Sequence, residues 1–228
     1  MPVPPLRPPL RRVALAGVEA LWRMMTVWGT AGPDDAVGRR FRSFGAGSAL
    51  GFPRGDVFNE WWITIGAGTL VCPFVNLSAG LPGEQLPQDG PPVVEIGDRC
   101  SIGKGSSLVG RCSIVLEDDV TVAPNVYITD HNHSYRDPEV PIGRQWVTEA
   151  PVRVGAGSWL GTGVVVLPGA RIGRHVAVAA GSVVRGVIPD FCVVAGSPAK
   201  VTRRLAPGGW EPPIPGEAPL PPADWPLR

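Results

Sequence analysis

Residues 154–189 read VGAGSW LGTGVV VLPGAR IGRHVA VAAGSV VRGVIP, one six-residue pattern repeated six times. Each unit opens on an aliphatic residue, and in most units a small residue follows within two positions. The aliphatic positions are Val154, Leu160, Val166, Ile172, Val178 and Val184. Neither the alternation of a half-buried strand nor the 3.6-residue stripe of a helix gives this spacing. A fixed six-residue period is typical of a parallel β-helix, in which each unit forms one side of a triangular coil. We therefore predict an all-β solenoid whose aliphatic residues point inward.

The same period extends toward the N-terminus with two interruptions. Its members are Phe44, Leu50, Ile65, Val71, Leu77, Ile96, Ile102, Leu108 and Ile114, then, after a shift of two residues, Leu116, Val122 and Ile128. Turn residues replace the period at residues 81–92 (LPGEQLPQDGPP), and a longer loop spans residues 129–151. Long loops inside a compact repeat are uncommon and tend to be functional. We therefore expect these two loops to serve the function.

Residues 11–28 (RRVALAGVEALWRMMTVW) are predicted to form one helix, with Leu15, Val18, Trp22 and Met25 on one face. Charged residues interrupt the apolar run, which is too short for a membrane span. No small-residue cleavage site accompanies it, so we do not predict a signal peptide. We expect the helix to cap the open end of the solenoid. The alternative is a basic, Trp-bearing interfacial helix that makes peripheral contact with a membrane.

The chain thus divides into three segments. Residues 1–43 form an N-terminal segment with the helix, residues 44–205 the β-helix domain, and residues 206–228 a Pro-rich C-terminal arm. The arm holds eight prolines with Trp210 and Trp225 among them. Such a segment is either disordered or extended and docked by its tryptophans. We expect a docked arm.

Composition excludes several classes of function. The 228 residues include 21 basic and 20 acidic ones, so a net charge of +1 gives no reason to expect nucleic acid as a partner. The four cysteines lack the spacing of a metal site and the density of a disulfide framework. We expect Cys72, Cys100, Cys112 and Cys192 to be small buried hydrophobic residues in a reducing, cytoplasmic compartment.

Four segments of residues 44–205 resemble the hexapeptide-repeat acyltransferases, in particular the maltose and galactoside O-acetyltransferases. They are VAPNVYITDH (122–131), SWLGTGVVVLPGARIG (158–173), AAGSVV (179–184) and AGSPAKVTRR (195–204). The resemblance implies a left-handed β-helix, a homotrimer with active sites between subunits, and acyl-CoA as co-substrate. The expected activity is transfer of an acyl group to a hydroxyl of a sugar, glycoside or polysaccharide precursor. Acyl length, from acetyl to medium chain, and the acceptor stay open.

Such a transfer needs a base for the hydroxyl proton and a hydrogen-bond donor for the oxyanion of the tetrahedral intermediate. The chain has three histidines. His131 enters the long loop and stands where the family's catalytic histidine stands, so we expect it to be the general base. His133 could replace it, orient the substrate or hydrogen-bond within the loop. We expect His175 to be a surface residue.

A carboxylate on the second ring nitrogen of His131 would fix its tautomer. Asp130, Asp137 and Glu149 are available, although direct sequence adjacency makes Asp130 an awkward partner. The orienting group therefore stays open at this point.

The resemblance also implies a donor site. Gly161 and Thr162 match the family's turn whose backbone contacts the pantetheine arm, and Ala180 matches a second such turn. Trp159 precedes the first turn and is expected to wall the groove.

For the phosphates of the nucleotide, Lys200 and Arg203 match the family's basic residues, a role that suits Lys and Arg at a solvated edge. Arg185 stands where the family often has Thr, and Gly186 where it often has Lys. Part of the phosphate contact that the family makes at these two positions is therefore expected to fall to other residues, and Arg185 is a further candidate. The family's acceptor-contacting positions do not match this chain.

Two other functions are compatible with a solenoid. One is a γ-class carbonic anhydrase, which holds zinc with three histidines. The spacing of His131, His133 and His175 does not resemble that set, and we expect no metal. The other is a scaffold subunit without chemistry, and the presence of His131, Trp159 and AGSPAK argues against it.

Overall fold

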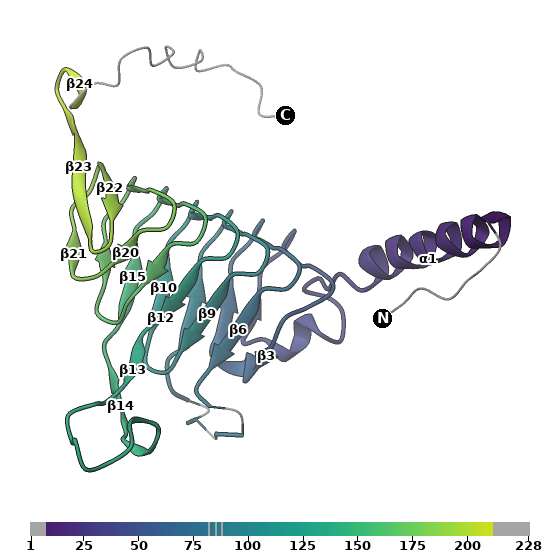
Figure 1. The fold of residues 1–228 in the computed structure, drawn as a ribbon, viewed down its shortest axis with the longest axis horizontal. Helices are drawn as coiled ribbons and strands as arrows, with labels where there is room; N and C mark the ends of the chain where they lie inside the picture. Colours follow the sequence, from purple (N-terminus) through teal and green to yellow (C-terminus); the bar gives the residue numbers. More distant parts are fainter. Residues whose placement is uncertain (1–7, 82, 85, 88, 212–228) are drawn as a thin grey trace.

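The computed structural model describes residues 8–211 except 82, 85 and 88. The described chain winds into a triangular prism with one parallel β-sheet on each side, and a single α-helix, α1 (Pro8–Trp28), stands apart from it (Figure 1). The sequence therefore predicted the parallel β-helix correctly. We name the three sheets faces one, two and three.

The strands of each face follow one another along the prism. Face one consists of β1 (Ser43–Phe44), β4 (Ile63–Ile65), β7 (Val94–Ile96), β10 (Ile114–Leu116), β15 (Val152–Val154), β18 (Arg171–Ile172) and β21 (Val187–Ile188). Face two consists of β2 (Ala49–Leu50), β5 (Leu70–Val71), β8 (Ser101–Ile102), β11 (Thr121–Val122), β16 (Trp159–Leu160), β19 (Ala177–Val178), β22 (Cys192–Gly196), β23 (Ala199–Ala206) and β24 (Gly209–Glu211). Face three consists of β3 (Val57–Phe58), β6 (Asn76–Ala79), β9 (Ser107–Gly110), β12 (Tyr127–Thr129), β17 (Val165–Val166) and β20 (Val183–Val184).

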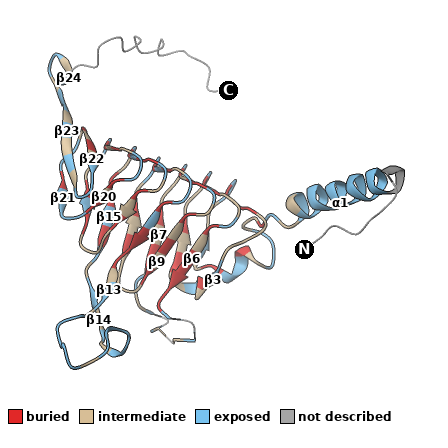
Figure 2. Cartoon of the chain, viewed as in Figure 1, coloured by how far each residue is buried: buried red, intermediate tan, exposed pale blue. Residues whose placement is uncertain are grey.

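The six-residue period fixes both register and core. Leu160 aligns with Val178, three units further along, and Val166 aligns in the same way with Val184. These side chains are fully buried, and the buried residues run along the inside of the prism (Figure 2). Burial of each such aliphatic side chain stabilises the fold by about 1.5–3 kcal/mol.

Hydroxyl side chains satisfy the backbone where the chain turns a corner. The buried Ser158 donates to the carbonyl of Gly173 (2.9 Å) and accepts the backbone N–H of Val176 (3.0 Å). Ser48 and Ser106 make the equivalent pair of bonds in other coils. A small hydroxyl residue thus ties one coil to the next without leaving an unpaired polar group.

Helix α1 does not cap the solenoid, so that expectation was wrong. Residues 11–25 are exposed, and the helix extends away from the prism (Figure 1). The open end is closed instead by the segment that follows the helix. Ala31 bridges to Leu50, and Phe41, just after the short helix η1 (Gly38–Arg40), is buried in the same core. Because these residues cover the first coil, no apolar end remains for α1. None of the described helices is long and apolar enough to cross a lipid bilayer.

Both loops leave the prism at the same corner, between faces three and one. The first joins β6 to β7. The second joins β12 to β15 and contains an antiparallel hairpin of β13 (His131–His133) and β14 (Val147–Glu149), with the short helix η3 (Ile142–Arg144) at its far end. Residues 111–113 cross this corner in the coil between them.

The C-terminal end of the described chain is an antiparallel hairpin. Strand β22 still pairs in parallel with β19, but β23 folds back on it and β24 on β23. Trp210, on β24, stacks on His175 with ring centroids 6.3 Å apart. Residues 212–228, with Trp225, lie outside the described residues.

All four cysteines are free thiols. The expectation of burial is confirmed for Cys100 and Cys192 and wrong for Cys72 and Cys112, which are half-buried at corners. One further short helix, η2 (Glu60–Trp62), precedes β4.

Candidate active site

The base of the second loop holds a buried carboxylate. Asp130 follows β12, and its side chain has no exposed surface. It accepts hydrogen bonds from the backbone N–H groups of Arg111 (2.8 Å), Cys112 (2.8 Å) and Ser113 (2.7 Å), which cross the same corner one coil earlier. Successive N–H groups directed at one point form an anion-binding nest. Asp130 is therefore held in one orientation by the backbone alone.

His131 is oriented by this carboxylate. Its Nδ1 lies 3.0 Å from Oδ1 of Asp130, and its side chain is 17% exposed. Since a carboxylate surrounded by donors accepts, it favours the proton on Nδ1, and in that tautomer of the neutral ring Nε2 is the acceptor. Thr129 adds a contact from its Oγ1 to Nδ1 (3.3 Å). The arrangement leaves Nε2 free to take a proton from a substrate.

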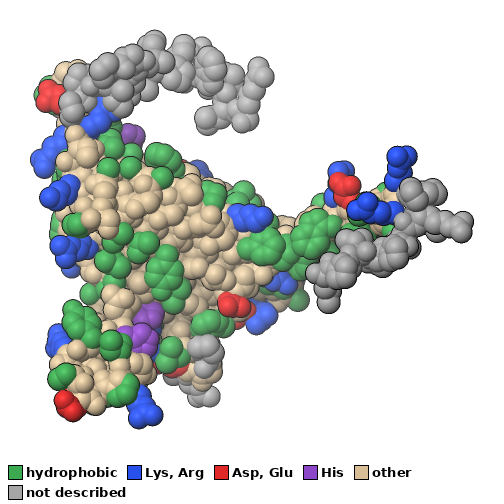
Figure 3. All heavy atoms as spheres, in the orientation of Figure 1, with side chains coloured by type: hydrophobic (Ala, Val, Ile, Leu, Met, Phe, Trp, Pro, Cys, Tyr) green, Lys and Arg blue, Asp and Glu red, His purple; other side chains and the backbone are tan. Residues whose placement is uncertain are grey.

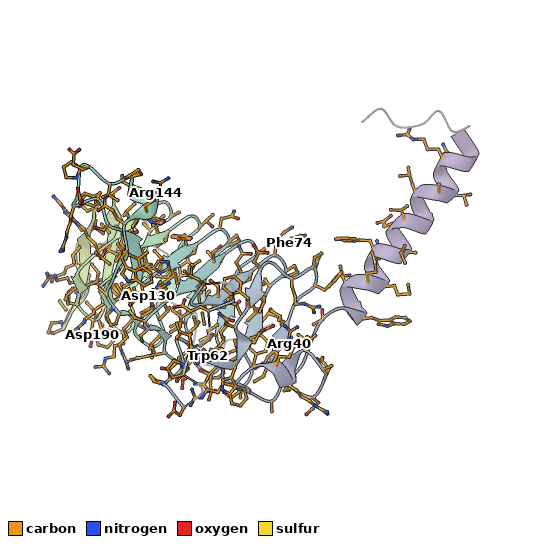
Figure 4. The ribbon with its side chains drawn as sticks, turned by 90° about the horizontal axis from the view of Figure 1, so that it is seen from below. Arg40, Trp62, Phe74, Asp130, Arg144 and Asp190 are labelled. Carbon is orange, nitrogen blue, oxygen red and sulfur yellow. The ribbon has the colours of Figure 1, made fainter. Side chains whose placement is uncertain are left out.

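The expectation that adjacency in the sequence would hinder a direct hydrogen bond between Asp130 and His131 was wrong. In a continuous strand, successive side chains point to opposite faces. Here the chain bends at Asp130, between β12 and β13, so the alternation is broken and both side chains reach the same corner. Figure 4, in which Asp130 is labelled, shows it among the coils of the prism and far from α1.

Glu149 does not orient His131, although the hairpin register places the two residues opposite each other. Its Oε1 instead accepts a hydrogen bond from Nε of Arg111 (2.8 Å). The other guanidinium nitrogens of Arg111 bind Glu84 of the first loop at 3.3 Å, and the guanidinium lies over the ring of Trp146 (5.1 Å). The bond to Glu149 raises the pKa of Arg111, whose side chain is only 7% exposed. One arginine thus ties the two loops together beside the Asp130 nest.

His133 lies on the same strand as His131, two residues further, and is exposed. Asp137, another orienting candidate, caps a turn in the loop by accepting the N–H of Glu139 (2.9 Å). Histidine side chains are visible where hairpin β13–β14 leaves the prism (Figure 3).

Cys112 lies in the nest, and its thiol is not a nucleophile near neutral pH. Burial, with a further contribution from the Asp130 carboxylate, raises the pKa of the Cys112 thiol to about 11. A protonated thiol is a poor nucleophile. Of Cys112 and His131, the oriented imidazole is therefore the better candidate for chemistry near neutral pH.

A hollow with a volume of about 320 Å³ opens on face two. It is lined by Gly157, Trp159, His175, Val176, Ala177, Val193, Arg203 and Trp210. Trp159 and Arg203, both predicted from the resemblance, therefore lie together, and Lys200 lies on the same strand as Arg203. His175 is exposed, as expected, but the sequence did not show that its ring contacts those of Phe191 and Trp210 at this hollow.

Gly161, Thr162 and Ala180 form stacked turns at the corner between faces two and three. The N–H of Gly161 donates to the carbonyl of Val178 (2.8 Å), and the N–H of Gly181 donates to that of Thr162 (2.9 Å). A Cβ on Gly161 would lie 2.7 Å from the backbone N of Ala180, so only glycine fits there. Thr162 and Ala180 are exposed along this edge.

Within one chain, the Asp130–His131 pair is separated from the stacked turns of Gly161 and Ala180. His131 leaves one edge of face three, whereas the stacked turns of Gly161 and Ala180 occupy the other edge. Arg185 follows β20 at the His131 edge and is exposed, so it does not join Lys200 and Arg203 in this chain. Among the described residues, no group of three or more His, Cys, Asp or Glu side chains is arranged to hold a metal ion.

The fold and the repeats define a class, the parallel β-helices built from hexapeptides. The family model for the bacterial transferase hexapeptide (six repeats) matches residues 151–186, and that for the hexapeptide repeat of succinyl-transferase matches residues 93–130. WbbJ of Escherichia coli K12, provisionally assigned as a lipopolysaccharide biosynthesis O-acetyl transferase, is 35% identical over 136 residues, which cover 57% of this chain and 69% of WbbJ.

The galactoside O-acetyltransferase of Escherichia coli K12 is 28% identical over 152 residues, which cover 67% of this chain and 68% of that enzyme. The chain belongs to the hexapeptide-repeat acyltransferases, in the sugar O-acetyltransferase branch, a membership that implies a left-handed winding. The chain spans 37–69% of the length of the first four curated relatives.

A similar solved structure is that of AntD, an N-acyltransferase from Bacillus cereus, in complex with dTDP and 3-hydroxybutyryl-CoA. The TM-score is 0.61 at 18% identity, and the match covers 73% of this chain and 84% of AntD. This likeness concerns the fold.

Proposed function

We propose that the protein is an acyl-CoA-dependent O-acyltransferase that acylates a hydroxyl of a sugar, glycoside or polysaccharide precursor, with His131 as general base. The observation that carries the proposal is the Asp130–His131 pair, in which Nδ1 is engaged and Nε2 is free. The names of the relatives support it, since WbbJ and the galactoside O-acetyltransferase are both named for O-acetyl transfer.

The proposed reaction begins when Nε2 of His131 takes the proton of the acceptor hydroxyl as its oxygen attacks the thioester carbonyl. A tetrahedral oxyanion forms and accepts a hydrogen bond from a backbone N–H near the turn of Gly161 and Thr162, or from a group of the second loop. The intermediate then collapses to the ester and expels the CoA thiolate, which receives the proton from His131. Throughout, Asp130 holds the imidazole and stabilises its protonated form.

The donor would lie along faces two and three. The pantetheine arm would follow Trp159, Gly161, Thr162 and Ala180, and the phosphates would meet Lys200 and Arg203. The flat rings beside the hollow offer a surface on which the adenine can stack. AntD, whose fold is similar, is in complex with an acyl-CoA, 3-hydroxybutyryl-CoA.

A homotrimer would complete the site. His131 and the donor groove lie at the two different corners that border face three. The second loop of one subunit, which carries His131, would therefore meet the donor groove of the next subunit. Arg185, at the His131 edge, would then reach the phosphates of a donor bound mainly by the neighbour. Since acyl-CoA is a cytoplasmic metabolite, the proposal places the enzyme in the cytoplasm.

Thiol release tests the proposed function. Wild-type protein is offered acyl-CoAs from acetyl to decanoyl against glucosides, maltose and glycerate-type glycosides, and mass spectrometry identifies the acylated product. We expect thiol release that depends on both partners, which would fix acyl length and acceptor class together. The absence of thiol release with every pair would favour a scaffold without chemistry.

Calorimetry tests the donor site separately. The Lys200→Ala, Arg203→Ala double variant should bind CoA more weakly than wild type, and wild-type affinity should fall with salt because exposed charges are screened. A double variant with unchanged affinity would refute this placement of the phosphates.

A further inference from the structure

Helix α1 exposes a large apolar surface that the rest of the described chain leaves uncovered. No described residue of the helix belongs to the core of the prism. Its exposed large side chains are Val13, Leu15, Val18, Leu21, Trp22, Met24, Met25, Val27 and Trp28. Val13, Val27 and Trp28 are each at least 70% exposed. Contiguous apolar surface of this kind marks an interaction site.

Three of the four charged residues of the helix lie on one narrow stripe. At 3.6 residues per turn, Arg12, Glu19 and Arg23 fall on one side, and Glu19 pairs with Arg23 at 3.1 Å. Arg11, at the N-terminal end of the helix, lies on the other side, in line with Trp22 and Val18. The apolar surface occupies most of the remaining circumference. Side chains accordingly project from all around the helix in Figure 4. The distribution is that of a strongly amphipathic helix with a broad apolar face.

The helix also has a fixed base. The carbonyl of Gly29, the residue after α1, accepts a hydrogen bond from Nη1 of Arg54 (3.1 Å), and two residues later Ala31 bridges to Leu50. A side chain on Gly29 would collide with Phe52. The prism therefore holds the C-terminal end of α1 while the apolar surface stays free.

We propose that α1 is an interfacial helix that binds the surface of an anionic lipid membrane. Three arginines and one glutamate give it a net charge of +2, and Arg11 and Arg12 have no ion-pair partner among the described residues. Tryptophan and arginine are the side chains that favour the headgroup region, with the apolar face below it. This proposal does not rest on the proposed acyl transfer.

Charge complementarity favours lipid over a second copy of the chain. Glu19 is the one acidic residue of the helix and is engaged by its own Arg23. A second helix would therefore offer no free carboxylate to Arg11 and Arg12. The apolar surface is also wider than the two-position seam that helix pairs bury. An anionic bilayer fits both features of the helix, since its interior accepts a broad apolar face and its headgroups supply negative charge for the arginines.

Flotation with vesicles tests the proposal on the full chain. We expect binding to phosphatidylcholine vesicles that contain phosphatidylglycerol, weaker binding at high salt, and little binding to phosphatidylcholine alone. Trp22→Asp should abolish binding. Arg11→Gln with Arg12→Gln should weaken it roughly thirtyfold, at about 1 kcal/mol per basic residue. Glu19→Gln, on the polar stripe, is the matched control and should bind at least as well as wild type.

Two results would overturn the proposal. One is the absence of binding to anionic vesicles by wild-type protein. The other is a fall in molar mass for Trp22→Asp, measured by light scattering without lipid, which would show that a second copy covers this face. Circular dichroism and thermal unfolding of each variant show that the prism is intact, which is expected because the substituted side chains are exposed.

Discussion

Asp130 determines what His131 can do. Its carboxylate accepts three backbone N–H groups and the ring N–H of His131, so every contact requires an acceptor. An amide in its place would turn an NH₂ group toward a donor. The buried carboxylate therefore fixes both the position and the tautomer of the base.

Asp130→Asn should lower turnover roughly 10²–10⁴-fold, because the imidazole loses its orienting acceptor. Affinity for CoA should be unchanged, since the buried Asp130 side chain contacts the backbone of residues 111–113 and His131 rather than the donor groove. This affinity also reports that the prism is folded. Steady-state thiol release across a range of pH checks the prediction. Asp137→Asn, in the exposed part of the same loop, is the control and should retain activity. Full activity of Asp130→Asn would contradict the role given to it.

Cys112 provides a chemical probe of the same nest. Its thiol pKa of about 11 leaves roughly one thousandth of it as thiolate at pH 8. Alkylation by iodoacetamide, followed by mass spectrometry, should therefore be slow at pH 8 and accelerate as pH rises toward 11, with Cys72 as the internal comparison. Asp130→Asn should accelerate labelling, since loss of a neighbouring negative charge lowers the thiol pKa. Rapid labelling of Cys112 in wild type at pH 8 would contradict the environment described.

At the scale of elements, the two loops act as one unit because Arg111 joins them. Its guanidinium bridges Glu84 in the first loop and Glu149 in the second, over the ring of Trp146. The bridge closes the corner at which the Asp130–His131 pair sits.

Arg111→Met should destabilise the fold by about 1–3 kcal/mol, since it leaves two half-buried carboxylates without their shared hydrogen-bond donor. Cleavage within residues 129–151 by a protease should become faster. Thermal unfolding and limited proteolysis measure the two effects. Arg99→Gln is the control, because it removes an exposed arginine–aspartate pair on the prism. It should change neither the thermal stability nor the rate of cleavage by much. Equal stability of Arg111→Met and Arg99→Gln would show that the bridge is not what holds the loops.

The six-residue period predicted the strands and core because it is a local signal that each coil repeats. Contacts between distant segments leave no such signal. No pattern in the sequence predicts the contacts of Arg111 with Glu84 and Glu149, or the stacking of Trp210 on His175. The antiparallel hairpins β13–β14 and β22–β23 were also missed, since each depends on a reversal rather than on the repeat. The helix was placed wrongly because the sequence did not show that Ala31 and Phe41 already close the prism.

At the scale of the whole molecule, the separation of base and donor groove favours a site shared between subunits, and we propose that there are three. Multi-angle light scattering at micromolar concentration should give three times the chain mass. A mixture of His131→Ala with the Lys200→Ala, Arg203→Ala variant, unfolded and refolded together, should regain part of the activity that each lacks. A monomer mass would contradict the shared site.

The most direct test of the account is the turnover of His131→Ala. With the acyl-CoA and acceptor pair that wild type uses best, thiol release should fall roughly 10²–10⁴-fold while CoA affinity and the trimer persist. His133→Ala, two residues further on the exposed strand, should lose far less. Equal thiol release by wild type and His131→Ala would contradict the claim that this histidine is the general base.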